Sequence, residues 1–230
     1  MNAVLFSGGV DSTLVAYMLK LRGIDFVAVT IDAEFISRRE IEFAKKIARI
    51  LGFKHTIVKI EPTSEFLRND DLRCYYCKRN MLTTVLSKFG SDVTIFDGTN
   101  RDDLNEFRPG LKANEEFGVV SPLKDLSKDE IREIAKSAGL PNWNKPSNSC
   151  LATRIVGEIT KDKLRMVEEA EEFLLSLGFN VVRVKHELGN ARIEVGRHEM
   201  RRAFELKEII VRKLKEIGFK RISLDLEGRF

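Results

Sequence analysis

A glycine-rich turn near the amino terminus carries the residues of this 230-residue sequence whose types and spacing point most clearly to chemistry. The segment Ser7–Ser12 reads SGGVDS and lies between a short apolar run and a stretch with helical periodicity. Gly8 and Gly9 let backbone N–H groups approach a ligand closely, and the start of the following helix favours an anion. Ser7 and Ser12 can add hydroxyl donors, while Asp11 can help to hold Mg²⁺ on a pyrophosphate. A glycine turn merely capped by serine fits this strand–loop–helix context less well.

The spacing of this turn excludes two familiar nucleotide motifs and resembles a third. The Walker sequence needs Gly-Lys-Ser/Thr after four intervening residues, and the dinucleotide motif needs G-x-G-x-x-G. The segment instead resembles the SGGxDS loop of the PP-loop ATP pyrophosphatases. That resemblance implies an enzyme that cleaves ATP between its α- and β-phosphates and activates a substrate as an adenylate.

Polar residues at two predicted strand ends are candidates for the rest of the ATP site. The resemblance implies an adenine site beside the loop, and Thr30 and Asp32 end a strand where open α/β sheets bind ligands. Asp97 and Gly98 follow another strand, and a glycine there would let a nucleotide approach closely. For Asp32 and Asp97, a carboxylate that only caps its own loop is an equally weighted alternative.

Three cysteines form the second candidate site. Cys74 and Cys77 have C-x-x-C spacing, which suits two ligands of one metal centre, and Cys150 follows much later. A structural zinc site takes four ligands, and the histidines are not suitably spaced. Three thiolates can hold a [4Fe-4S] cluster with one iron open to a ligand such as sulfide, although four cysteines are usual. A redox dithiol and buried apolar cysteines stay open as alternatives on spacing alone.

Several further segments, taken in order, resemble the LarE family of ATP-dependent sulfur transferases over nearly the whole chain. They are residues 97–100 (DGTN), 107–113 (FRPGLKA), 142–145 (NWNK), 150–154 (CLATR), 182–185 (VRVK), 191–194 (ARIE) and 224–228 (LDLEG). The resemblance implies adenylation of a carboxylate of pyridinium-3,5-biscarboxylic acid mononucleotide, a small nucleotide-like substrate on the route to a nickel-pincer cofactor. Within the second segment, Arg108 is expected at the nucleotide site.

The same resemblance assigns roles to the cysteines and their neighbours. In one branch of the family a cysteine at the position of Cys150 gives up its own sulfur and becomes dehydroalanine. A second branch has two further cysteines, as Cys74 and Cys77 here, and resembles enzymes that bind a cluster and deliver sulfide catalytically. The expected cofactors are therefore ATP, Mg²⁺ and a [4Fe-4S] cluster held by all three cysteines. Lys78 and Arg154 adjoin the cysteines and are candidates for holding a substrate carboxylate or phosphate.

Four charged residues in the second half are candidates for substrate binding. Arg183 and Lys185 share one face of a predicted strand and match the family's anchors for the substrate phosphate. A solvated basic strand face is the alternative. Glu171 and Glu194 match acidic residues near the family's substrate site, and a surface carboxylate is at least as good an interpretation of Glu171.

Alternating segments predict the elements that must position these residues. Short β-branched runs lie at residues 3–6, 26–31, 56–60 and 93–96, and helical periodicity lies at residues 12–21, 38–51, 78–88 and 128–140. This order predicts an α/β fold with a doubly wound parallel sheet over residues 1–154. From residue 160 the order α-β-β-α-β, ending in a helix over 200–217 and a strand over 221–226, predicts a smaller α+β domain over residues 155–230, for substrate binding or oligomerisation.

Composition also bears on the class of protein and on its location in the cell. Lys and Arg number 39 and Asp and Glu 35, and the resulting net charge of +4 gives little support to nucleic-acid binding. No run of about 18 apolar residues predicts a membrane helix, and the absence of a basic leader predicts a cytoplasmic protein. The family resemblance adds a homo-oligomer, commonly a hexamer.

Three rival functions stay open. A PP-loop enzyme that thiolates tRNA is the main alternative, although no strongly basic segment or zinc-knuckle pair is present. An ammonia-using synthetase has no need of three cysteines in this arrangement. A nucleotide-binding module with a structural metal site would bind ATP without turnover.

Overall fold

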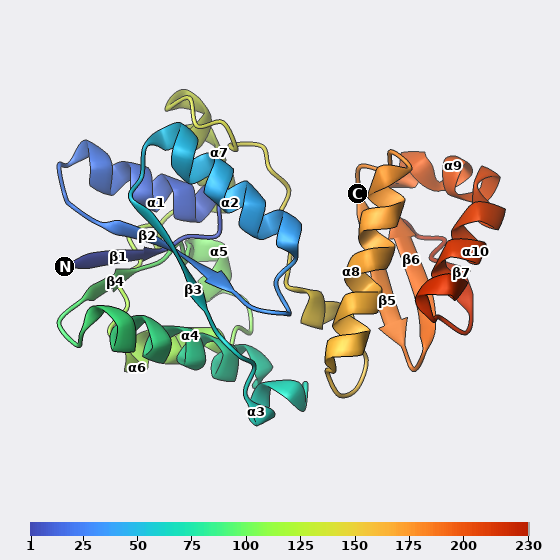
Figure 1. Ribbon diagram of the computed structural model, residues 1–230. Coiled ribbons are helices and arrows are strands. Elements are labelled where there is room, and N and C mark those ends of the chain that lie inside the picture. Colours follow the sequence, from blue (N-terminus) through green and yellow to red (C-terminus); the bar gives the residue numbers. More distant parts are fainter. Residues whose placement is uncertain (230) are drawn as a thin grey trace. The chain divides into compact units, whose positions relative to one another are not determined.

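The computed structural model describes residues 1–229, which form two compact units (Figure 1). The first unit contains Met1–Phe66 and Asp70–Asn148, and the second contains Leu67–Asn69 and the described residues from Ser149 to 229. The second unit thus starts slightly earlier than the predicted boundary after Arg154, and it includes a short excursion from the first half of the chain.

Four short parallel strands form the sheet of the first unit, in the order β3-β2-β1-β4. Their bounds are Asn2–Leu5 for β1, Val27–Asp32 for β2, His55–Lys59 for β3 and Thr94–Phe96 for β4. The central strand β2 is buried along almost its whole length, as expected for a strand covered on both faces. The predicted α/β fold with a doubly wound parallel sheet is confirmed.

Helices cover both faces of this sheet (Figure 1). On one face lie α1 (Val10–Leu21), α2 (Arg38–Leu51) and α7 (Lys128–Ser137), and on the other lie α4 (Arg73–Phe89) and α6 (Gly110–Glu116). The short helices α3 (Ser64–Leu67) and α5 (Arg101–Leu104) occupy connections. Phe6 directly after β1, Leu14 in α1 and Ile131 in α7 belong to the buried core on the first face. None of the helices within residues 1–229 has the length and apolar character needed to cross a membrane.

The second unit contains a smaller mixed sheet with helices packed on it. The hairpin strands β5 (Val182–Glu187) and β6 (Asn190–Val195) are antiparallel, and β7 (Ile222–Leu224) pairs in parallel with β6. The helices are α8 (Lys161–Ser176), α9 (Met200–Glu205) and α10 (Lys207–Ile217), with 3₁₀ turns η1 (Leu151–Arg154) and η2 (Arg197–Glu199). Leu174, Val184 and Leu214 are fully buried in its core.

The largest departures from the predicted helix bounds concern two helices. Helix α4 begins at Arg73 rather than near Lys78, so the C-x-x-C pair lies within its first turns. The helix predicted over residues 200–217 is divided at Leu206, whose backbone leaves the helical region at φ −92° and ψ 9°. Neither proline nor glycine occurs in residues 200–217, so the sequence carries no local signal for this division.

Candidate active site

The glycine-rich turn Ser7–Ser12, here called the phosphate loop, connects β1 to the first turn of α1 and has one position that only glycine can occupy without strain. Gly8 has φ +70°, and a Cβ there would lie 2.8 Å from the Cα of Ala44 in α2. The hydroxyl of Ser12 donates to the carbonyl of Gly9 at 3.2 Å and accepts from the N–H of Ser7 at 3.3 Å. The predicted loop residues therefore form a compact turn at the start of a helix, where an anion is stabilised.

Asn142 fastens this loop from a distant part of the first unit. Its buried amide donates to the carbonyl of Gly8 at 2.8 Å and to Thr13 Oγ1 at 2.9 Å. Arg132 holds the same segment by donating to the carbonyls of Trp143 and Lys145 at 3.3 and 3.2 Å. Sequence reasoning singled out this segment only as a family motif, because a lone asparagine carries no signal for a partner 134 residues away.

Asp11 brings a poorly neutralised carboxyl to the phosphate loop. Burial, followed by the charge of Asp103, raises the pKa of Asp11 to about 6, although Lys128 and Arg132 oppose the shift. Its buried Oδ1 has no hydrogen-bond partner among the described residues. Asp103 itself pairs with Arg108 at 3.0 Å, which links that predicted nucleotide residue to this group of charges. A buried carboxylate oxygen without a donor fits the hard cation Mg²⁺, which prefers oxygen ligands.

Asp97, directly after β4, is a buried centre of hydrogen bonds. Its Oδ2 accepts from Lys78 Nζ at 2.8 Å, Asn114 Nδ2 at 2.7 Å and Thr99 Oγ1 at 3.0 Å. Its Oδ1 accepts from Ser121 Oγ at 2.7 Å and from the N–H of Thr99 at 3.1 Å. Burial would raise the pKa of Asp97, but the Lys78 ammonium and these donors hold it at about 2. The carboxylate is therefore ionised and engaged by the protein on both oxygens.

Gly98 places the turn after β4 directly against the phosphate loop. A Cβ at this position would lie 2.8 Å from the Cβ of Asp11 and 2.9 Å from the backbone nitrogen of Ser12. Real Cβ atoms do not approach backbone so closely, hence only glycine permits this contact. The structure thus brings the predicted residue Gly98 and the loop together.

Thr30 and Asp32, at the carboxyl end of β2, both contact other protein groups. Thr30 Oγ1 donates to the carbonyl of Phe6 at 2.6 Å and lies 2.8 Å from His55 Nε2. Asp32 forms an ion pair with Arg38 at 2.6 Å. Their contact with adenine stays a prediction. Their backbone lies at the carboxyl end of β2, the end of a parallel sheet at which α/β proteins bind ligands.

The three cysteines are divided between the two units. Cys74 is exposed and Cys77 half-buried on α4 of the first unit, whereas half-buried Cys150 precedes η1 in the second. None of the three forms a disulfide. Within residues 1–229, no group of three or more His, Cys, Asp or Glu side chains is arranged to hold a metal ion. Metal binding by the cysteines stays a prediction.

Arg154 and Glu171 form a buried pair that holds the turn carrying Cys150. Arg154 donates from Nε to Glu171 Oε1 at 3.0 Å and from Nη1 to the carbonyls of Ser149 and Cys150 at 2.6 and 2.9 Å. Glu171 also accepts from the N–H of Val184 at 3.0 Å. Glu171 is thus a buried residue and not the surface carboxylate of the alternative interpretation. The geometry gives Arg154 a structural task beside Cys150, and its direct contact with substrate stays a prediction.

The basic residues of β5 lie near this turn within the second unit. Arg183 donates to Ser149 Oγ at 3.0 Å, and burial, followed by two neighbouring guanidinium groups, lowers its pKa. Lys185 and Arg229 each pair with the buried carboxylate of Glu194 at 3.0 Å. Burial would raise the pKa of Glu194, but these cations lower it. Arg183 has no carboxylate partner among the described residues, and a phosphate would supply the missing negative charge.

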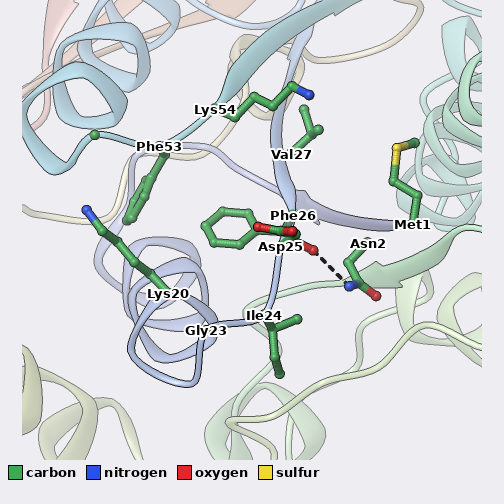
Figure 2. A pocket seen from close by; sticks show the side chains of 11 residues that line it. Met1, Asn2, Lys20, Gly23, Ile24, Asp25, Phe26, Val27, Phe53 and Lys54 are labelled. Carbon is green, nitrogen blue, oxygen red and sulfur yellow. Dashed lines mark hydrogen bonds between the residues drawn. The ribbon is translucent and has the colours of Figure 1, made fainter.

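A cavity of about 590 Å³ opens at the opposite, amino-terminal edge of the parallel sheet. Figure 2 shows Phe26 and Phe53 beside it, together with Lys20 and Lys54. Lys20 donates to the carbonyl of Leu51, the last residue of α2, and so satisfies a carbonyl at the carboxyl end of that helix. The cavity contains none of the predicted site residues, and ligands of open α/β sheets bind at the other edge.

Comparisons with known proteins agree with this geometry. The family model described as queuosine biosynthesis protein QueC matches residues 2–73. An uncharacterized protein of Synechocystis sp. is 37% identical over 98% of this chain and 88% of its own length. Pyridinium-3,5-bisthiocarboxylic acid mononucleotide synthase of Lactiplantibacillus plantarum is 34% identical over 98% of this chain and 85% of its own. A tRNA-specific 2-thiouridylase of Fusobacterium nucleatum is 29% identical over 62% and 46%, respectively.

A parallel sheet with an SGGVDS turn at its carboxyl edge, as seen here, defines a PP-loop protein of the ATP pyrophosphatase class. Likeness to the synthase extends over both units rather than over the phosphate loop alone. The chain belongs to the LarE family and is an ATP-using sulfur transferase.

Proposed function

We propose that this enzyme replaces a carboxylate oxygen of a small nucleotide-like molecule with sulfur, and that its substrate is pyridinium-3,5-biscarboxylic acid mononucleotide. The observation that carries the proposal is full-length likeness to a synthase named for the corresponding bisthiocarboxylic acid. The phosphate loop accounts for the ATP requirement, and the cationic face around Arg183 suits the phosphate of a mononucleotide. Substrate identity, adenylation and the source of sulfur are the parts that experiment must test.

The first step of the proposed reaction is adenylation. A carboxylate oxygen of the substrate attacks the α-phosphorus of ATP, the bond to the β-phosphate oxygen breaks, and pyrophosphate leaves with the electron pair. Mg²⁺ bound near Asp11 and the N–H groups at the start of α1 would neutralise the leaving pyrophosphate. The Lys78 ammonium is hydrogen-bonded to Asp97, directly after β4, and so places a positive charge at the carboxyl end of the sheet.

Sulfur replaces AMP in the second step. A sulfur nucleophile adds to the acyl carbon, and AMP departs with the electron pair of the carbon–oxygen bond. If the nucleophile is the Cys150 thiolate, a thioester forms; loss of the cysteine α-proton to a base then expels the thiocarboxylate and leaves dehydroalanine. If the nucleophile is sulfide, the thiocarboxylate forms directly and Cys150 survives.

The cysteines fit a [4Fe-4S] cluster in number and chemistry. Cys74 and Cys77 are one helical turn apart, Cys150 supplies a third thiol, and none is consumed in a disulfide. A cluster held by these three residues would supply an iron with a free position for sulfide. We therefore favour catalytic sulfide delivery over sacrifice of Cys150.

Anaerobic iron and sulfide analysis tests the sulfur source. We expect about four irons per chain in the wild-type enzyme and loss of iron in Cys74→Ala, Cys77→Ala and Cys150→Ala. Mass spectrometry of the wild type after turnover should show Cys150 intact. A wild type that takes up no iron and loses H₂S from Cys150 would establish the sacrificial route instead.

Product analysis tests the substrate. We expect AMP, pyrophosphate and a thiocarboxylate only when the pyridinium biscarboxylate is present. A tRNA thiolation enzyme is the second candidate because part of the chain is similar to a tRNA 2-thiouridylase. Salt-sensitive, sub-micromolar tRNA binding in a filter assay, without product from the pyridinium substrate, would favour that function.

A further inference from the structure

The carboxylate of Asp97 connects three parts of the first unit that otherwise lie apart in the sequence. Its hydrogen bonds reach Lys78 on α4, Asn114 on α6 and Ser121 in the segment after α6. It also fixes its own loop through Thr99. Because both oxygens already accept protein donors, Asp97 has little capacity left for a direct bond to ATP.

Gly98, the residue after Asp97, packs directly against the phosphate loop. Gly98 contacts Asp11 and Ser12 so closely that even a methyl group would force the two backbone segments apart. The position of the turn after β4 therefore determines where the loop lies, and the reverse also holds.

Asp97 also contacts α4 next to its cysteines, through Lys78. Lys78 directly follows Cys77 in the helix, and its ammonium has no hydrogen-bond partner other than Asp97 within residues 1–229. An ammonium has three N–H donors, so two stay available for an anion. Helix α6 also packs closely here, because a Cβ on Gly110 would lie 3.4 Å from the carbonyl oxygen of Cys74.

We propose that Asp97 is a positioning residue that aims the Lys78 ammonium at the reacting phosphates and fixes the Cys74–Cys77 turn of α4 relative to the phosphate loop. The proposal rests on the function proposed above for its catalytic consequence, but its structural consequence does not. It assigns Asp97 a task beyond both interpretations of its sequence position, the nucleotide contact and the capping of its own loop.

Kinetics of AMP release test the catalytic part, with Asp97→Asn, Lys78→Met and the double variant. We expect kcat to fall at least tenfold in each single variant while the Kd for ATP of Asp97→Asn stays within about threefold. Because the two residues act as one unit, the double variant should be no slower than the slower single variant. Asp97→Glu should recover part of the activity. The exposed residues Asp92 and Arg79 provide charge-matched controls in Asp92→Asn and Arg79→Met.

A large rise in the KM for ATP with unchanged kcat in Asp97→Asn would overturn the proposal, because it would indicate a direct nucleotide ligand. Additive losses in the double variant would do the same. Thermal unfolding of each variant shows whether it is folded, and Lys78→Met, which alters the more exposed partner, keeps the test available if Asp97→Asn fails to fold.

Thiol reactivity tests the structural part without any turnover. The full-length, reduced, iron-free chain is treated with iodoacetamide, and modification of Cys74 and Cys77 is followed by peptide mass spectrometry. We expect at least threefold faster modification of these two thiols in Asp97→Asn and Lys78→Met, with no change at Cys150 or in the controls. Unchanged rates at Cys74 and Cys77 would overturn the positioning of the turn. If the wild type makes no thiocarboxylate, the proposed function fails while this measurement still decides the inference.

Discussion

At the phosphate loop, the Asp11 carboxyl is placed where the protein disfavours its charge. Its pKa rises from 3.8 to about 6, first through burial and then through Asp103. The folded chain therefore keeps this proton up to about pH 6, whereas the unfolded chain releases it near pH 3.8. Stability thus falls as the pH rises through this window, and above it the ionised group costs of the order of 3 kcal/mol.

We therefore expect Asp11→Asn to unfold at a higher temperature than the wild type at about pH 7 without nucleotide, with the difference vanishing near pH 4. The same variant should bind Mg²⁺–ATP more weakly, because it lacks the charge that attracts the cation. Thermal scans across this pH range and calorimetric titration with Mg²⁺–ATP measure the two effects. Asp92→Asn, at an exposed position, is the control. Parallel pH curves for Asp11→Asn and wild type would contradict the assignment.

Residue types in the phosphate loop were sufficient to predict its function, because glycine and serine there have few other uses after a buried strand. Partners of isolated charged residues were not predictable in this way. Arg154 and Glu171 bond each other across 17 positions, and nothing local in the sequence distinguishes them from surface charges. The role of Asp97 likewise depends on donors from three separate segments.

Among the elements, the segment after α7 can be tested directly, because its residue Asn142 is hydrogen-bonded to the phosphate loop and to α1. Asn142→Ala removes two donors to Gly8 and Thr13 and leaves a buried carbonyl without its partner. We expect a loss of about 1–3 kcal/mol in unfolding free energy and weaker ATP binding. Urea denaturation and ATP titration report these changes. Asn144→Ala, two residues away at an exposed position, should alter neither. Normal ATP affinity in Asn142→Ala would show that the loop holds its shape unaided.

Element types followed from periodicity, whereas some boundaries did not. The capping box of Ser127 and Glu130 marks the start of α7 in sequence and structure alike. By contrast, α4 has no capping side chain at Leu72, so its true start before Cys74 could not be read from a cap. The bend at Leu206 between α9 and α10 is also unmarked, because ordinary helix-forming residues flank it.

For the whole molecule, alternating strands and helices predicted the parallel sheet and the change to a second architecture. They did not predict that Leu67–Asn69 belongs with the second unit. Asn69 has φ 60° and donates to the carbonyls of Ile155 and Gly157 at 2.8 and 2.7 Å. Such a contact joins residues more than 80 positions apart, so no local pattern reports it.

Two substitutions at Asn69 separate its hydrogen bonds from its backbone. Asn69→Gly keeps the left-handed conformation and removes both bonds, so we expect it to lose about 1–3 kcal/mol of stability. Asn69→Ala should lose roughly 1 kcal/mol more, because alanine is strained at this φ. Urea unfolding of the full chain measures both, with exposed Asn105→Ala as control. Equal stability of Asn69→Gly and wild type would mean that water replaces these bonds without cost.

The excursion at Leu67–Asn69 means that the polypeptide passes between the two units three times, after Phe66, after Asn69 and after Asn148. Exchanging the chain between two relatives at a single junction would therefore separate residues 67–69 from the unit to which they belong. A chimera joined only at Asn148 would combine the second half of one parent with the tripeptide of the other. Transferring residues 67–69 together with the chain after Asn148 would keep the whole second unit from one parent. A change in the activity of such a chimera could then be assigned to that unit.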